Sequence, residues 1–405
     1  MRRNKGRWLL PILWIATSLG SPACAHVPKR HPLPAADVDF AEVLGIPRAR
    51  YWGDRAPPWS HDWLDKPTAE LKGRYPAVYG RPMTFLAISG GGEDGAFAAG
   101  LLLGWTEQGD RPEFTTVTGV SAGALVAPFA FLGPEYDYVL RRVTLELKKS
   151  DVAKERRIIQ GLRSDAMAST APLQALIAKY VDKEVMEKIA EQHRRGRTLN
   201  IGTTNLDSMR PVVWRLGTIA NSGHPKALAL IRQVLLASAS IPAAFPPVLI
   251  EVEAKGQAYD ELHVDGGATS QVFLYPVGLD FDEVIRRLKI PGRPKVYVVR
   301  NARLDPTYEA TKPKTLPIAA RSVMSLVRTQ GIGDLYQIYI ETFRDGLDYN
   351  LAYIPESFTD TSKGMFDTDY MREMYQMAFD FAKAGYPWHK LPPGLKGALI
   401  KGKPR

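Results

Sequence analysis

The chain has 405 residues, of which 45% are hydrophobic and 24% charged, enough to bury a large core in one large or two moderate globular domains. Its formal net charge is +10, yet no cluster of basic and aromatic residues indicates nucleic-acid binding, so we expect no nucleic-acid partner. A single cysteine excludes an internal disulfide, and the sequence shows neither repeats nor low-complexity tracts.

The first 25 residues have the pattern of a secretory signal. Four basic side chains precede a 13-residue apolar run, Trp8 to Gly20, which is too short to span a bilayer. Two processing routes stay open: cleavage after the Ala-x-Ala at 23–25, or lipidation of Cys24, although Ser21 stands where a lipobox prefers leucine. We therefore expect an exported protein that is periplasmic, anchored in the envelope or secreted.

The rest of the chain divides by composition. Residues 26–82 are rich in Pro, Arg, Trp and Tyr and are expected to form an extended lead-in that wraps the core. From Met83 strands and helices alternate, which is typical of βαβ units and a parallel sheet with helices on its faces. The expected strands are 83–89, 114–120, 197–206, 211–219 and 294–302, and the expected helices are 95–108, 122–133, 226–240, 318–343 and 368–384. We expect a catalytic domain over 83–280 and a C-terminal α/β elaboration, 281–405, packed on the same core.

A glycine-rich turn follows the first of these strands. Gly90, Gly92 and Gly95 match the spacing of a dinucleotide-binding loop, in which glycines let the backbone approach a phosphate at a helix N-terminus. That use also requires an acidic residue about 20 positions further on. The sequence instead places Gly119-Val120-Ser121-Ala122-Gly123 there, so we expect no bound nucleotide.

This second motif has the form of a nucleophile elbow. Ser121 falls between a β-branched strand and an apolar helix, and Gly119 and Gly123 remove the Cβ atoms that would collide in so tight a turn. The dipole of the following helix would favour a developing negative charge. Ser121 is therefore the candidate nucleophile.

Asp265 is the candidate proton acceptor. It ends the stretch ELHVD, and Gly266 and Gly267 behind it allow a sharp turn that leaves the carboxylate projecting. Burial would raise its pKa and let it take the serine proton directly, whereas a surface Asp-Gly turn is the alternative. If Asp265 were instead the acid of a Ser-acid-His order, His389 is the histidine left to serve as base.

The remaining candidates are expected to be structural. His263 shares a strand face with Asp265 and is expected to be packed and hydrogen-bonded, and Asn205 and Asp207 are expected to end a strand. The aromatic pattern of the C-terminal helix is expected to cover the core, with a lid or lipid-docking face as the alternative.

Three motifs, SGGGEDG, GVSAG and HVDGG, stand in an order that resembles the patatin-like phospholipases. The similarity covers roughly residues 83–274 and includes TGVSAGALVAPF, IGTTNLD and ASASIPAAFPPV. It implies a three-layer α/β/α fold with a mostly parallel central sheet. The resemblance also assigns four roles: Ser121 as nucleophile, Asp265 as general base, the N–H groups of Gly90, Gly91 and Gly92 as the oxyanion hole, and Gly95 as the start of the next helix.

One position departs from the family pattern. Many members carry Arg or Lys just before the last glycine of the loop, whereas this chain has Glu93 and Asp94. The backbone donors are unaffected, but the preference for phospholipid is put in doubt.

The activity that the resemblance implies is hydrolysis of lipid esters through an acyl-serine, without metal or cofactor, on a lipid or membrane surface. An acyl transferase with the same dyad and a non-enzymatic envelope protein are the alternatives. The oligomeric state is not predicted.

Overall fold

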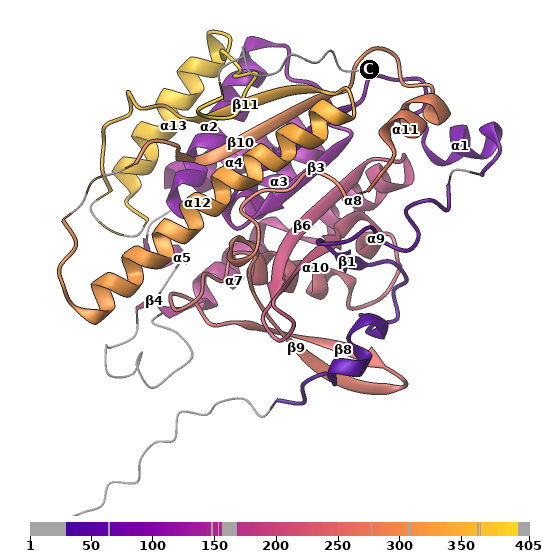
Figure 1. Ribbon diagram of the computed structural model, residues 1–405, viewed down its shortest axis with the longest axis horizontal. Helices are drawn as coiled ribbons and strands as arrows, with labels where there is room; N and C mark the ends of the chain where they lie inside the picture. Colours follow the sequence, from indigo (N-terminus) through magenta and orange to yellow (C-terminus); the bar gives the residue numbers. More distant parts are fainter. Residues whose placement is uncertain are drawn as a thin grey trace, which may run out of the picture.

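The computed structural model describes residues 30–395, apart from positions 64, 147–148, 153, 156–167, 277, 307, 309, 363 and 365 (Figure 1). The predicted signal sequence and Cys24 lie outside the described residues, so both stay predictions.

A mixed sheet forms the centre of the molecule. Its strands follow the order β1-β7-β6-β3-β2-β10-β11, with β9 beside the end of β6 and β8 beside β9. From β6 to β11 the neighbours are parallel, while β1, β7, β8 and β9 run antiparallel to their partners. This confirms the predicted α/β class with a mostly parallel central sheet. Within the described residues its strands are β1 (Arg50–Trp52), β2 (Thr84–Ile88), β3 (Thr116–Val120), β6 (Thr198–Asn205), β7 (Arg210–Arg215), β8 (Val248–Ala254), β9 (Gln257–Asp265), β10 (Lys295–Arg303) and β11 (Asp348–Ile354).

Helices cover both faces of this sheet and make it the middle of three layers. The larger hydrophobic core lies under α2, α3, α4, α7, α8, α9, α10 and α13, and the smaller one under α1, α11 and α12. Alternate residues of one strand enter different cores: Leu86 of β2 packs into the larger and Phe85 into the smaller, as the two-residue period of a strand requires. Figure 1 shows α12 crossing one face diagonally and extending past the edge of the sheet.

The described helices have the following bounds. They are α1 (Thr68–Arg74), α2 (Gly95–Gln108), α3 (Ala122–Leu132), α4 (Asp137–Glu146), α5 (Lys149–Val152), α7 (Ala171–Tyr180), α8 (Lys183–Arg194), α9 (Leu216–Ala220), α10 (Ala227–Ser238), α11 (Phe281–Leu288), α12 (Thr315–Arg344) and α13 (Thr368–Lys383). Short 3₁₀ turns occur at η1 (Ala35–Phe40), η2 (Gly92–Asp94), η3 (Pro134–Tyr136) and η4 (Gly266–Ala268), and a two-stranded ladder joins β4 (Lys154–Glu155) to β5 (Ala168–Ser169).

The helices α2 and α13 approach closely because α2 carries small residues on the facing side. A Cβ on Gly100 would lie 2.2 Å from the carbonyl oxygen of Tyr375, and one on Gly104 would lie 2.2 Å from that of Phe379. This contact fixes the C-terminal helix onto the helix that follows the glycine-rich turn.

The sequence located most of the parallel core but missed parts of its margins. The predicted helix 95–108 coincides with α2, whereas the predicted strand 211–219 is wrong after Arg215, where the chain turns into α9. The lead-in is not simply extended, because it contains η1, β1 and α1. The β8–β9 hairpin and the edge strand β11 were not predicted as such.

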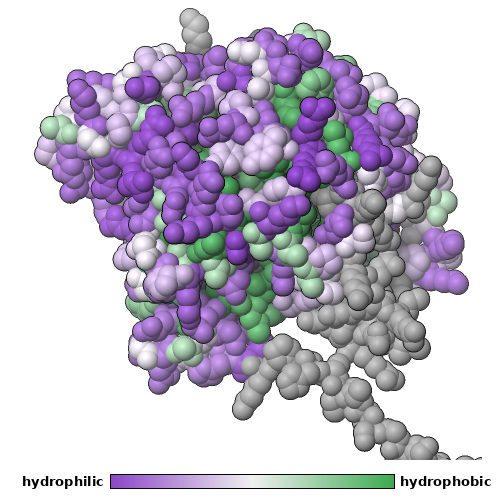
Figure 2. Space-filling model, turned by 180° about the vertical axis from the view of Figure 1, so that it is seen from behind, coloured by the Kyte–Doolittle hydropathy of each residue, from purple (hydrophilic) through white to green (hydrophobic). Residues whose placement is uncertain are grey.

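None of the described helices is long and apolar enough to cross a bilayer. Figure 2 shows the face opposite that of Figure 1, where hydrophobic residues gather through the middle of the view between hydrophilic margins.

Candidate active site

The register of β6 brings the ends of two other strands together. One edge of β6 pairs with β7 from Asn200 to Asn205, so β3 and β9 both pair with the opposite edge. There Val120 of β3 lies opposite Gly202, and Asp265 of β9 lies opposite Thr203, the next residue of β6. Since β9 runs antiparallel to β3, the two strands meet end to end. Ser121 and Asp265 therefore come together although they lie 144 positions apart in the sequence.

Ser121 occupies a strained turn between β3 and α3. Its φ of 56° and ψ of −124° are disfavoured for a residue with a Cβ, and such strain is concentrated at functional sites. The flanking glycines allow the turn: a Cβ on Gly119 would lie 2.5 Å from the carbonyl oxygen of Gly123, and one on Gly123 would lie 2.3 Å from that of Ile88. This is the geometry of a nucleophile elbow.

The carboxylate of Asp265 is buried beside this serine. The residue is 4% exposed, and its Oδ1 accepts a 2.7 Å hydrogen bond from the N–H of Gly267. Oδ2 is buried without a hydrogen bond of ordinary geometry in the described part of the chain. Burial raises the pKa of Asp265 to about 7, although the Ser121 hydroxyl and the Gly267 N–H lower it in part. At neutral pH this carboxyl can both accept and return a proton.

The C-terminal end of α10 fixes the backbone of both residues. The N–H of Ser121 donates to Ser238 Oγ (3.0 Å), which in turn donates to the carbonyl of Gly202 (2.7 Å). The N–H of Asp265 donates to the carbonyl of Ser240 (2.9 Å). One helix end thus sets the position of the serine relative to the carboxylate. No motif in the sequence predicted a role for Ser238 or Ser240.

The glycine-rich turn after β2 lies beside the elbow, and it corrects one expectation. The N–H of Gly90 donates to the carbonyl of Gln271 (3.1 Å), so it is not free to hold an oxyanion. Gly90 serves close packing instead, because a Cβ there would lie 3.0 Å from Ser121 Cβ. In the described structure the N–H groups of Gly91 and Gly92 have no acceptor and are the free donors of the turn. Gly95 begins α2, as predicted, and a Cβ there would lie 2.9 Å from Ala122 Cβ.

Asn301 of β10 holds this turn from outside the region of the three motifs. Its Nδ2 donates to the carbonyl of Ser89 (2.8 Å), its Oδ1 accepts from the N–H of Ala98 (3.1 Å), and its own N–H donates to Ser89 Oγ (2.8 Å). Asn301 is fully buried, so water cannot reach these groups. Each of the three hydrogen bonds supplies the partner that a buried polar group needs. The turn is thereby fixed at both of its ends.

Gln271 connects the turn to the base. Its backbone carbonyl receives the N–H of Gly90, and its Nε2 donates to the carbonyl of Gly267 (2.7 Å), the residue whose N–H bonds Asp265. Its Oε1 accepts from Arg300 Nη1 (3.3 Å). A single residue, through its backbone and its side chain, therefore links the glycine-rich turn, the Asp265 loop and a buried guanidinium.

The sequence model of the family described as patatin-like phospholipase matches residues 86–277, which contain the turn, the elbow and the Asp265 carboxylate. Residues 86–277 form a patatin-like phospholipase domain. The family is one of lipid hydrolases. No curated protein sequence matches the chain at a significant level.

Two solved structures are similar to the chain at low identity. VipD from Legionella pneumophila is 14% identical over 75% of this chain, with a TM-score of 0.34. Human GIVD cytosolic phospholipase A2 is 11% identical over 83% of this chain, with a TM-score of 0.37. The chain covers 66% and 63% of these two proteins, less than two thirds of either.

The acidic residues of the patatin-like domain's glycine turn have a structural explanation. Glu93 Oε2 accepts the N–H of Asp367, the residue before α13, at 3.0 Å, and Asp94 Oδ1 accepts the hydroxyl of Tyr370 at 2.7 Å. Burial raises the pKa of Asp94 to about 6, while Tyr370 and two arginines of β10 lower it in part. The two carboxylates thus tie the turn to the C-terminal helix.

The glycine-rich turn carries no cationic side chain, but two arginines of another strand lie near it. Arg300 and Arg303, near the end of β10, are the two arginines that act on Asp94. Arg300 is 4% exposed, and burial lowers its pKa to about 10, with Asp334 and Asp94 opposing that decrease. Positive charge therefore reaches the patatin-like site from β10 rather than from the turn itself.

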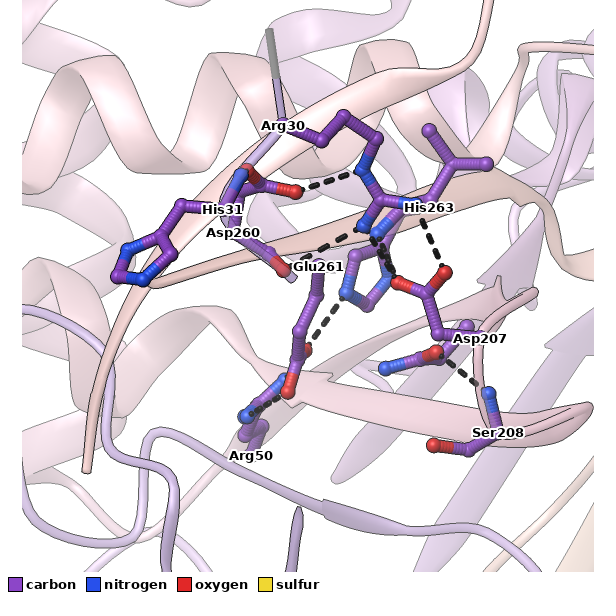
Figure 3. A network of polar contacts seen from close by, with 10 residues as sticks. Arg30, His31, Arg50, Asp207, Ser208, Asp260, Glu261 and His263 are labelled. Carbon is purple, nitrogen blue, oxygen red and sulfur yellow. Dashed lines mark hydrogen bonds and ion pairs between the residues drawn. The ribbon is translucent and has the colours of Figure 1, made fainter. Parts of the chain in front are cut away.

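His263 belongs to a buried polar network at the edge of the patatin-like domain (Figure 3). Its Nδ1 lies 3.0 Å from Thr203 Oγ1 and its Nε2 lies 3.0 Å from Glu261 Oε2, whose carboxylate pairs with Arg50. Burial raises the pKa of Glu261, but Arg50 and His263 outweigh burial and lower this pKa to about 2. Burial lowers the pKa of His263. The histidine is packed and hydrogen-bonded, as the sequence indicated.

Asp207 and Asn205 have structural contacts at the turn after β6. Asp207 pairs with Arg30, which also pairs with Asp260 (2.7 Å each), and Asn205 Oδ1 accepts the N–H of Ser208 (3.0 Å). In Figure 3 these contacts join the N-terminal segment to β9. The segment is thus attached to the strand that carries Asp265.

His389 is not placed to act on Ser121. Its backbone pairs with Leu351 of β11, three strands away from β3. His389 lies one strand spacing beyond β11, and neighbouring strands are about 4.8 Å apart, so it lies roughly 19 Å from β3 across the sheet. Within the described part of the chain, no group of three or more His, Cys, Asp or Glu side chains is arranged to hold a metal ion.

Proposed function

We propose that this protein is a serine acyl hydrolase that cleaves ester bonds of lipids through a Ser121-Asp265 dyad. The observation that carries the proposal is the strained serine elbow next to a buried carboxyl whose pKa is raised to about 7. The family match supports a lipid as the class of substrate. A lone strained serine would lack a base, and a lone buried carboxyl would lack a nucleophile.

The reaction follows from these groups. Asp265 takes the hydroxyl proton as Ser121 Oγ attacks the ester carbonyl, and the N–H groups of Gly91 and Gly92 stabilise the oxyanion. The tetrahedral intermediate collapses to an acyl-serine and releases the alcohol, which receives the proton from Asp265. Water then attacks the acyl-serine with Asp265 again as base, and the free acid leaves.

The accessibility of the residues supports this division of roles. Gly91 is exposed, whereas Ser121 and Asp265 are 6% and 4% exposed. Gly91, one of the two proposed oxyanion donors, therefore lies on the open side, from which an ester would enter. The dyad lies behind them, where exclusion of water strengthens its electrostatic contacts.

A labelling experiment tests the proposal. We expect an alkyl fluorophosphonate to label the purified wild type but neither Ser121→Ala nor the wild type after boiling. Ser222→Ala is the matched control, because Ser222 lies in a turn after α9 and its Oγ bonds only nearby backbone, donating to the carbonyl of Ile219 and accepting the N–H of His224. Equal labelling of Ser121→Ala and the wild type would contradict the assignment.

A lipid panel then identifies the ester. Phospholipid, lysophospholipid and acylglycerol vesicles are incubated with wild type, Ser121→Ala and Asp265→Asn, and free fatty acid is quantified. We expect release by the wild type alone, and transfer of the acyl group to added alcohol would instead identify a transferase. No release from any lipid would overturn the proposed hydrolase. Export, as the N-terminal sequence predicts, would place this activity in the envelope or outside the cell.

A further inference from the structure

A pocket lies at the N-terminal ends of β3 and β6, whereas Ser121 follows the C-terminal end of β3. It has a volume of about 270 Å³ and is lined by the first residues of β3 and β6, Thr116 and Thr198. Five positions of extended chain separate Thr116 from Ser121, so the pocket lies roughly 16 Å from the serine along β3. Its inner wall belongs to the smaller hydrophobic core, on the side of α1 and α11 (Figure 1). This location separates it from the proposed catalytic site.

The strand register collects polar side chains on the wall of this pocket. Asn200 of β6 pairs with Arg215 of β7, and Tyr51 of β1 lies opposite Val213, two positions before Arg215. Tyr51, Asn200 and Arg215 therefore share one face of the sheet at neighbouring positions, and all three line the pocket. Their hydroxyl, carboxamide and guanidinium groups are all hydrogen-bond donors.

Two of these donors have no hydrogen-bond partner among the described residues. Tyr51 and Asn200 are each 8% exposed, and neither the hydroxyl nor the carboxamide makes a hydrogen bond within the described part of the chain. Neither group is among the fully buried polar atoms without a partner, so both can be reached from the pocket. A ligand in the pocket that accepts hydrogen bonds can therefore bond both donors.

The pocket also has an excess of positive charge. Arg48, Arg74 and Arg215 line it, and among the described residues only Arg48 is paired with a carboxylate, that of Asp62. Arg215 Nη1 donates to the backbone carbonyl of Arg48 (3.2 Å), and Arg74 contacts the ring of Tyr75. An adjoining pocket shares these three arginines and is also lined by His193. Burial, together with the charges of Arg215 and Arg74, lowers the pKa of His193 to about 4, as expected in a positive potential.

The rest of the lining is apolar and aromatic. Trp59, Trp63, Tyr275, Leu279 and Phe281 are among the lining residues. A small inorganic anion would satisfy the arginines but leave this apolar wall in contact with water. A ligand with an anionic head and a hydrocarbon tail matches both parts.

We propose that this pocket binds an anionic amphiphile, with its carboxylate or phosphate on Arg215 and Arg74 and its acyl chain against the aromatic wall. The site does not depend on the proposed reaction at Ser121. Tyr51 and Asn200 supply further donors to the head group, whereas Asp62 keeps Arg48 occupied at the rim.

Calorimetric titration of Ser121→Ala, which cannot turn over an ester, tests this site. The probes are decanoate, decyl phosphate, decanol and inorganic phosphate. We expect decanoate or decyl phosphate to bind, and the tighter of the two identifies the head group. Decanol and inorganic phosphate are expected to bind about tenfold more weakly or worse, because each offers only half of the complementarity.

Charge variants in the same background locate the binding. Arg215→Gln and Arg74→Gln are expected to weaken binding of the better amphiphile about tenfold or more. Arg74 is exposed and has no carboxylate partner among the described residues, so its variant keeps the test valid if Arg215→Gln fails to fold. Arg372→Gln is the matched control, because Arg372 lies on α13, pairs with Asp369 and should leave binding unchanged. Unchanged affinity in Arg74→Gln and in any folded Arg215→Gln, or equally tight binding of decanol, would overturn the proposal. So would equally tight binding of inorganic phosphate and decyl phosphate.

Discussion

The backbone of Gly91 passes so close to Asn301 that a Cβ on Gly91 would lie 2.1 Å from the Asn301 carbonyl oxygen. No real contact is that short, so any other residue at position 91 must displace either the turn or the end of β10. The same contact fixes the backbone of Gly91, whose N–H has no acceptor among the described residues. The two residues together therefore set the position of the proposed oxyanion donors.

Gly91→Ala is expected to reduce kcat about 100-fold with little change in KM, because displacement of one oxyanion donor removes stabilisation made only in the transition state. Gly92→Ala is the matched comparison. At position 92 a Cβ meets nothing within 4 Å. The alanine is strained only because its backbone must adopt a φ of +59°, which residues with a side chain disfavour. Its loss of kcat should be much smaller. Equal losses in an ester assay would show that the contact with Asn301 does not matter.

The activity should follow the protonation of Asp265. The base acts as a carboxylate, and burial raises the pKa of Asp265 to about 7, so kcat/KM should rise with pH and reach half its maximum near pH 7. A pH-rate profile of the wild type checks this. A half-maximum near pH 4 would indicate a carboxyl in an ordinary aqueous environment.

The stability of Asp265→Asn relative to the wild type should increase as the pH rises. Between about pH 4 and pH 7 the folded wild type keeps a proton that the unfolded chain releases, so Asp265 destabilises the fold progressively over this window. Asparagine has no such proton. The stability of the variant relative to the wild type should therefore increase by about 3 kcal/mol between pH 5 and pH 8. Urea unfolding at both pH values measures it, and a pH-independent difference would contradict the raised pKa.

Gln271→Met keeps the side-chain volume but removes the bonds to Gly267 and Arg300. We expect about a tenfold loss of kcat and a higher pH for half-maximal kcat/KM, because the Gly267 N–H would stabilise the carboxylate less firmly. Gln337→Met is the control, since Gln337 bonds only Glu341 on the exposed side of α12. A loss of stability without a shifted pH profile would mean that Gln271 only packs the core.

Tyr370→Phe removes the hydroxyl that binds Asp94 while keeping the ring. The expected cost is about 1 kcal/mol of stability at neutral pH, because a partly buried carboxylate loses a partner. The loss of kcat should be smaller than that of Gly91→Ala, because Glu93 still ties the turn to α13. Tyr308→Phe, at a residue 96% exposed, should change neither quantity. A loss of kcat as large as that of Gly91→Ala would give Asp94 a direct role in the reaction.

The sequence predicted the elbow because its requirements are local. A serine between a strand and a helix needs glycines on both sides, and those glycines are adjacent in the chain. The prediction that Gly90 is an oxyanion donor was wrong because the partner of its N–H lies far away in the sequence. Its N–H is taken by Gln271, and no pattern near either residue indicates that bond.

Long-range partners explain the other omissions. Asn301 has an ordinary strand context, and its importance depends on the pairing of β10 with β2. Glu93 and Asp94 looked anomalous because their partners lie more than 270 positions away in the sequence. The junction of β3 with β9 likewise depends on the register of β6, and hydrophobic periodicity does not encode which strands become neighbours.

The position of Asn301 has a consequence for defining the functional unit. The recognised family segment ends at residue 277, while the side chain that anchors the glycine turn comes from a strand that begins at Lys295. A fragment trimmed to the recognisable segment would keep the serine and the carboxylate but lose the support of the oxyanion donors. Expression of residues 86–277 alone should therefore give a chain that has both halves of the dyad and no competent enzyme.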